Sequence, residues 1–156
     1  NTGSYSENMA YLISKFFIAI GKGKNYIFGQ GPFNGEYNLE ESATSNKYRY
    51  SRHLNVLREN EVLQRSGGSF RWINEAIKAT RKLKKEENIK KIQIPILLFQ
   101  SGKDTFVNDE GHNTFYKHAN NCKFIRFDNA KHELYFESDD ILEPYLNEIV
   151  KFYNEI

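Results

Sequence analysis

The first twenty residues carry a helical pattern of apolar positions. Apolar side chains recur at three- and four-residue steps over residues 4–20, which predicts an amphipathic helix. Ser4 and Glu7 have the spacing of a capping box at its start, and Gly21 and Gly23 supply the backbone freedom that ends a helix. Because a helical face rich in Met and Phe is usually buried, we expect this face in the core rather than along an acyl channel.

A long loop and two further helices follow. Residues 29–46 are rich in Gly, Asn, Ser and Glu, which predicts a loop of a length typical of lids and other functional segments. A second helix is predicted over about 46–60, and Ser69 is the expected N-cap of a third helix that runs to about Lys85. Trp72 is expected to be a buried anchor. The other expected buried positions are Tyr50, Leu54 and Leu57 on the second helix and Phe70, Ile73, Ile77 and Leu83 on the third.

The pattern changes at Ile92, beyond which short apolar runs alternate with helical periodicity. In order, the predicted elements are a strand at 94–99, a helix at 109–119, a strand at 122–127 and a helix at 139–155. The continuous apolar first run is typical of a parallel strand buried on both faces, and the order strand–helix–strand–helix implies a right-handed crossover. We therefore expect an α/β fold, with a helical cap region at 1–90 and a strand-and-helix part at 91–156. Two parallel strands need neighbours at their edges, so polypeptide outside these 156 residues is expected to complete the sheet.

Composition and charge exclude several classes of protein. Hydrophobic residues make up 39% and aromatic residues 15% of the chain, which is enough apolar surface to exclude a disordered polypeptide. The net charge is only +2, and the densest basic run, residues 81–85, is followed at once by Glu86 and Glu87. This run is typical of a solvated helix end, so nucleic acid is not an expected partner. No apolar run reaches the roughly 18 residues that a membrane-spanning helix requires.

The cysteine and histidine content gives no metal site or cofactor site. Cys122 is the single cysteine, so an internal disulfide is excluded and a reducing compartment such as the cytoplasm is favoured. His112 and His118 are six residues apart, which does not place them on one helical face as zinc ligands. The glycine pairs at 21–23 and 29–31 lack the full spacing of phosphate-binding loops. We therefore expect no metal and no cofactor.

The candidate chemistry lies in Asp104 and His132, each just beyond a predicted strand. The carboxyl ends of parallel strands share one edge of a sheet, so an acid and an imidazole placed there can meet. An acid that orients a histidine is the arrangement used in nucleophilic catalysis. Taken singly, Asp104 is also explained as a turn residue and His132 as a solvated loop side chain. The sequence contains no Gly-x-Ser-x-Gly elbow, so a nucleophilic serine is expected in a preceding segment.

The segments around these two residues resemble a known family. Residues 94–104 (Ile-Pro-Ile-Leu-Leu-Phe-Gln-Ser-Gly-Lys-Asp), followed by Phe106 and Val107, look like the strand and acid loop of α/β-hydrolases. Residues 130–134 (Ala-Lys-His-Glu-Leu) look like the catalytic-histidine motif of that family. Similar cap-region segments occur at 28–32, 48–52 and 67–72. Over nearly its whole length the chain is similar to the bacterial lysophospholipase and monoacylglycerol-lipase branch of the α/β-hydrolase family.

The resemblance implies the C-terminal part of an α/β-hydrolase sheet preceded by a helical cap that shelters an acyl chain. It implies a serine hydrolase of lipid esters, with Asp104 as the triad acid and His132 as the general base and acid. The family's chain order places the serine and the oxyanion-hole amides before residue 1, so this chain alone is expected to be inactive. The expected partners are a lipid ester, the N-terminal half of the same protein and the surface of the inner membrane.

Two other classes remain open. The chain is also compatible with a non-catalytic module that binds a lipid or a protein partner. Another enzyme of the same fold, such as a dehalogenase or a thioesterase, is a further alternative, because a fold does not determine its chemistry. A separation of Asp104 and His132 beyond hydrogen-bonding distance would favour the non-catalytic module.

Overall fold

The computed structural model describes residues 5–65 and 67–155, which form two compact units. The first, here called the strand unit, consists of residues 36–56 and 86–155. The second, here called the helical unit, consists of residues 5–35 and 57–85 apart from Ser66. The assignment of residues 1–90 to a cap stays a prediction. Ser4 of the predicted capping box lies outside the described residues.

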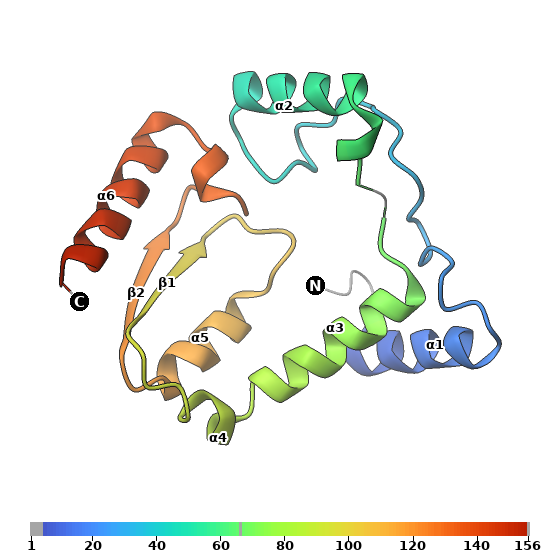
Figure 1. Ribbon diagram of the computed structural model, residues 1–156, viewed down its shortest axis with the longest axis horizontal. Coiled ribbons are helices and arrows are strands. Elements are labelled where there is room, and N and C mark those ends of the chain that lie inside the picture. Colours follow the sequence, from blue (N-terminus) through green and yellow to red (C-terminus); the bar gives the residue numbers. More distant parts are fainter. Residues whose placement is uncertain (1–4, 66, 156) are drawn as a thin grey trace. The chain divides into compact units, whose positions relative to one another are not determined.

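The strand unit is built on a parallel two-stranded sheet (Figure 1). Strand β1 (Ile96–Ser101) pairs along its whole length with β2 (Cys122–Phe127). Helix α5 (Asp109–His118) joins the two strands, and α6 (Asp139–Glu155) follows the second. The predicted order of strands and helices in this part of the chain is therefore confirmed.

The two faces of the sheet are covered by different helices. Alternate residues of each strand point to opposite faces, so each helix contacts a different set of strand side chains. On one face Phe99 and Phe127 lie against Tyr145 of α6, with ring centroids 4.7 Å and 6.5 Å from the tyrosine ring. On the other face Phe124 stacks on Tyr116 of α5 at 4.9 Å. Figure 1 shows α5 and α6 on opposite sides of the two strands. The helices thus cover the faces of the sheet, and the loops that follow the strands lie at its carboxyl edge.

The apolar core of the strand unit lies beneath α6. It consists of Ala130, Leu134 and Ile141, with the rings of the α6 face packed around them. Residues 96–99 of β1 are half-buried, whereas the sequence pattern predicted a strand buried on both faces. The difference arises because each strand of a two-stranded sheet has a neighbour on one edge only.

The helical unit pairs α1 (Glu7–Ala19) with α3 (Phe70–Leu83). Ser6 is the N-cap of α1, and Ser69 is the N-cap of α3 as predicted. Gly21, with a φ of 79°, follows α1 in the left-handed region that favours glycine. The remaining helical segments are α2 (Lys47–Glu59), which runs from the first unit into the second, α4 (Glu86–Ile89), and the short 3₁₀ turns η1 (Glu61–Leu63) and η2 (Leu134–Phe136).

A buried polar contact lies between α1 and α3. The side-chain amide of Asn74 donates a hydrogen bond to the hydroxyl of Ser14 at 3.0 Å, and both residues are buried. Beside it the rings of Phe17 and Phe70 stack with their centroids 4.0 Å apart. The inner face of α1 therefore includes Ser14 and Phe17, of which only Phe17 belongs to the predicted apolar pattern.

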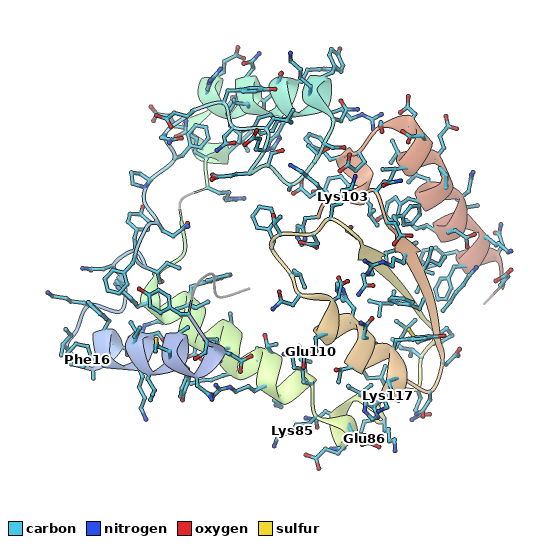
Figure 2. All side chains as sticks on the ribbon, turned by 180° about the vertical axis from the view of Figure 1, so that it is seen from behind. Phe16, Lys85, Glu86, Lys103, Glu110 and Lys117 are labelled. Carbon is cyan, nitrogen blue, oxygen red and sulfur yellow. The ribbon has the colours of Figure 1, made fainter. Side chains whose placement is uncertain are left out.

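Three expectations for this unit are wrong in whole or in part. Of the six apolar positions that the pattern places on the buried face of this helix, Ile13 and Phe17 are half-buried. The other four, Met9, Leu12, Phe16 and Ile20, are exposed, and Figure 2 labels Phe16 on α1. Trp72, predicted as a buried anchor, is 61% exposed, and Leu83 is exposed as well. Both lie roughly 200° around the helix from Phe70, which is buried, so they point away from the face that packs on α1.

Candidate active site

The loop after β1 carries Asp104 and is fastened to the loop after β2. The Gly102 amide donates to the Phe127 carbonyl at 2.8 Å, and the Lys103 amide donates to the Ala130 carbonyl at 2.9 Å. Lys103 is labelled in this loop in Figure 2. These two bonds continue the pairing of the strands beyond their ends, so both loops leave the sheet at the same edge.

Gly102 makes this close approach possible. A Cβ atom at this position would lie 2.4 Å from the Asp128 carbonyl oxygen and 2.6 Å from the Asp128 Cα. Both distances are far below van der Waals contact, and backbone atoms cannot move aside as a flexible side chain can. Only glycine therefore fits between the two loops. The sequence shows Gly102 merely as a turn residue, and its partner is 26 positions away.

Asp104 is held as a buried, hydrogen-bonded carboxylate. Its side chain is 7% exposed, and Oδ1 accepts hydrogen bonds from the amides of Phe106 at 2.8 Å and Val107 at 2.9 Å. Burial opposes ionisation of this carboxyl. The hydrogen bonds from His132, Val107 and Phe106 outweigh that effect, so the pKa of Asp104 lies below its ordinary value of 3.8.

His132 meets this carboxylate directly. Its Nδ1 lies 2.8 Å from Asp104 Oδ2, within hydrogen-bonding distance. Because an ionised carboxylate only accepts hydrogen bonds, Nδ1 carries the proton and Nε2 is the acceptor of the neutral ring. The imidazole is 41% exposed, and the Phe106 ring lies 5.3 Å from it, centroid to centroid. The arrangement leaves an oriented base at the carboxyl end of the sheet.

A buried carboxylate that the sequence pattern does not single out lies beside this pair. Glu137 is 0% exposed, and its Oε1 accepts a hydrogen bond at 2.9 Å from the amide of Lys131, the residue before His132. In the sequence Glu137 is one acidic residue in a polar turn. Its carboxylate accepts from the amide of Ser45, 92 positions away, a contact that the local pattern does not reveal.

The other candidate residues lie apart from the pair. His53 is on α2, and His112 and His118 are on α5, as the pattern predicted. Within the described ranges, 5–65 and 67–155, no group of three or more His, Cys, Asp or Glu residues is arranged to hold a metal ion. Cys122 is in β2 as expected, and burial raises the pKa of its thiol.

Comparison with known proteins identifies the family. The family described as "Serine aminopeptidase, S33" matches residues 7–139, which is most of the chain. The chain belongs to this family of α/β-hydrolases. The predicted resemblance to the lysophospholipase and monoacylglycerol-lipase branch is confirmed.

One curated relative and two solved structures support the assignment. The chain is 30% identical over 143 residues to "Probable lysophospholipase L2" of Haemophilus influenzae, covering 92% of this chain and 45% of the relative. A soluble variant of monoglyceride lipase from Saccharomyces cerevisiae matches with a TM-score of 0.65 and 19% identity, over 96% of this chain and 48% of that one. The monoacylglycerol lipase of Paleococcus ferrophilus matches with a TM-score of 0.61 and 13% identity, over 97% and 53%. This chain thus has the α/β-hydrolase fold and spans about half the length of these proteins.

Within the described residues, 5–65 and 67–155, no helix of this α/β-hydrolase chain combines the length and the apolar character needed to cross a bilayer.

We expect Gly102→Ala to destabilise this α/β-hydrolase by about 1–3 kcal/mol, the cost of overpacking a close contact. The added methyl group must push the Asp128 backbone away, which lengthens the two hydrogen bonds that join the loops. Urea denaturation would measure the loss. Gly31→Ala is the matched control, because a Cβ there meets no atom within 4 Å. Equal stabilities of the two variants would contradict the proposed steric role of Gly102.

The lowered pKa of Asp104 makes its contribution to stability depend on pH. A carboxyl with a folded-state pKa below its unfolded-state value stabilises the fold above the unfolded-state value, and this contribution is lost as pH falls through the folded-state pKa. The stability difference between the wild type and Asp104→Asn should therefore be largest above about pH 5 and shrink below it. Denaturation at a series of pH values tests this. A difference that grew towards low pH would show that the sign is wrong.

Proposed function

We propose that this chain supplies the acid and the histidine of a serine hydrolase that cleaves a carboxylic ester of a lipid. Asp104 is the acid and His132 is the base. The observation that carries the proposal is the 2.8 Å contact between His132 Nδ1 and a buried Asp104 carboxylate. Such a contact is the geometry by which an acid fixes the tautomer of a catalytic histidine. Membership of a serine hydrolase family supports the same reading.

The proposed mechanism follows from the two nitrogens of His132. With Nδ1 donating to Asp104, Nε2 takes the proton of a serine hydroxyl as the serine attacks the ester carbonyl. The buried carboxylate then stabilises the imidazolium that forms. As the tetrahedral intermediate collapses, Nε2 returns this proton to the leaving alcohol and an acyl-enzyme is left. A water molecule, deprotonated by the same nitrogen, then attacks the acyl carbonyl. As the acyl–oxygen bond to the serine breaks, Nε2 returns the proton to the serine oxygen and the fatty acid is released.

The nucleophile of the proposed enzyme comes from polypeptide that precedes this chain. The sequence has no Gly-x-Ser-x-Gly segment, and the chain spans only 45% of its curated relative. We call the longer polypeptide, with that preceding segment, the full-length hydrolase. The chain alone is proposed to be inactive because it lacks the group that attacks the ester.

The substrate class proposed is a lipid with one acyl chain. Support comes from the names of the relatives, a "Probable lysophospholipase L2" and two lipases of monoglycerides or monoacylglycerols. Lysophospholipids and monoacylglycerols share an ester of one fatty acid with a glycerol oxygen. The proposal therefore covers the ester and its acyl chain, and leaves the head group to experiment.

The decisive assay compares the full-length hydrolase with residues 1–156 expressed alone. We expect the longer protein to release fatty acid from a lysophospholipid or a monoacylglycerol, and its serine to react with a fluorophosphonate probe. The shorter chain should do neither. A full-length protein that hydrolyses no monoacyl lipid and takes up no probe would overturn the proposal and favour a non-catalytic module.

A further inference from the structure

We propose that Glu137 is a positioning residue for His132 and acts with a segment distant in the sequence, residues 38–45. This segment is here called the brace. The inference rests on the proposed function, since it concerns how the histidine of that site is held. Glu137 and the brace both belong to the strand unit. No contact of Glu137 with the reacting atoms is required, because it acts through the backbone that carries His132.

The carboxylate of Glu137 joins the histidine loop to the brace. Its Oε1 accepts from the Lys131 amide at 2.9 Å and from the Ser45 amide at 3.0 Å. Its Oε2 accepts from the Ser45 amide at 3.1 Å and from the Ser45 hydroxyl. A wholly buried carboxylate is costly unless such donors satisfy it. Both of its oxygens are therefore committed to holding these two backbone segments together.

Lys131 makes a second connection between the same two segments. Its ammonium group donates to the carbonyl oxygens of Leu39 at 2.9 Å, Glu40 at 2.7 Å and Ser42 at 3.3 Å. A lysine ammonium has three N–H donors, so all three can be used in these bonds. The charge of Lys131 thus lies against the brace, and its main chain is bound by Glu137.

The amide on the other side of His132 is also held by the brace. The Glu133 amide donates to the Ala43 carbonyl at 2.9 Å. The amides of residues 131 and 133 are therefore both fixed, the first by Glu137 and the second by the brace. His132 lies between them in a stretch with no regular helix or strand. Its backbone position is determined by these side-chain and loop contacts.

The brace is itself anchored near Glu137. The Thr44 hydroxyl donates to the Phe136 carbonyl at 2.7 Å. The guanidinium of Arg49, just beyond the brace, binds the main-chain carbonyl of Glu137 and the carboxylate of Asp139. The brace lies within residues 29–46, which the sequence predicted as a loop suited to a lid. Here it is tied to the histidine loop at several points.

These contacts matter for catalysis because the hydrogen bond between His132 and Asp104 tolerates only a small displacement of the imidazole ring. A misplacement of about 1 Å in a catalytic group costs about 10²-fold in rate. Loss of the Glu137 carboxylate frees the Lys131 amide and weakens the attachment of the brace. The imidazole would then sample positions in which Nδ1 no longer meets Asp104. The effect should appear in kcat, since a base acts on the chemical step, while KM changes little.

The test compares variants of Glu137 with matched controls in the full-length hydrolase. Glu137→Ala removes the carboxylate. Glu137→Gln keeps an oxygen for the Lys131 and Ser45 amides, and its amide nitrogen can donate to the Ser45 hydroxyl, so it should restore function. The matched controls are Glu143→Ala, an exposed carboxylate on α6, and Lys117→Met, an exposed lysine on α5 that is labelled in Figure 2.

Two measurements separate positioning from folding. Hydrolysis of a monoacylglycerol gives kcat and KM, and proton NMR detects the low-field signal of an imidazole Nδ1–H bonded to a carboxylate, assigned by its absence in His132→Ala. We expect Glu137→Ala to lower kcat about 10²-fold and to weaken or shift this signal. Glu137→Gln and both controls should keep the signal and most of the activity. Should Glu137→Ala fail to fold, Lys131→Met takes its place, with the same direction of change expected.

The two measurements also separate this inference from the proposed function. The inference is overturned if a folded Glu137→Ala, or Lys131→Met in its place, keeps both the wild-type kcat and the wild-type imidazole signal. It is also overturned if Glu137→Gln loses as much as Glu137→Ala, because the hydrogen-bond geometry would then not be the cause. Full activity in His132→Ala would instead overturn the proposed function, and the NMR signal would still report whether Glu137 holds the ring.

Discussion

Replacement of His132 by alanine in the full-length hydrolase should lower kcat on the order of 10⁶-fold, the size of the loss when the histidine of a serine hydrolase triad is removed. The reason is the position of the ring. Its Nδ1 is bound to a buried carboxylate at 2.8 Å, which leaves Nε2 to take the proton of the nucleophile. Without the ring, no group bonded to Asp104 remains to activate a serine. Substrate binding should change little, because the imidazole contributes mainly to the transition state.

The measurement is the rate of fatty-acid release from a monoacylglycerol, together with the rate at which a fluorophosphonate labels the serine. Both should fall in parallel. His118→Ala is the control, since this histidine lies at the end of α5 and its ring nitrogen faces Glu86 at 3.6 Å rather than Asp104. A His132→Ala enzyme within about tenfold of the wild type would show that His132 is not the base, because general-base catalysis alone contributes at least about 10²-fold.

Much of the strand unit could be predicted from the sequence because its signals are local. The strand at 122–127 and the helix at 139–155 occur where their apolar periodicities place them. The start of α1 was harder, because serines at positions 4 and 6 both precede the apolar pattern and spacing alone does not choose between them. Ser6 is the N-cap that the structure shows. The burial of β1 also depends on how many strands lie beside it. The apolar pattern of a single strand does not indicate that number.

The candidate pair was predictable for a reason of topology, whereas its supports were not. Asp104 and His132 follow two parallel strands, so the fold itself brings their loops to one edge. Gly102 and Glu137 matter through contacts with backbone that is distant in the chain, 92 positions away in the case of Ser45 and Glu137. Trp72 shows the same limit, because its large apolar ring suggested burial and only the packing of α3 on α1 determines which face is covered.

Replacement of Asp104 by asparagine should lower kcat by about 10⁴-fold, as the corresponding change does in other acid–histidine–serine triads. The loss follows from the orientation of the new amide. The amides of Phe106 and Val107 donate to Oδ1 at 2.8 Å and 2.9 Å, so the asparagine must keep its oxygen there. Its NH₂ group then faces His132 Nδ1 and donates to it. This places the imidazole proton on Nε2, where a base needs a lone pair.

The side chain is nearly isosteric, so the loss should come without collapse of the loop, and the far-ultraviolet circular dichroism spectrum should match that of the wild type. Asp140→Asn, an exposed change on α6, serves as the matched control for removal of one negative charge. The kinetics should show kcat reduced with KM nearly unchanged, because the tautomer affects proton transfer rather than binding. If Asp104→Asn kept kcat within about tenfold while His132→Ala lost it, the histidine would act without orientation by Asp104. The 2.8 Å contact would then serve the stability of the two loops and not the reaction.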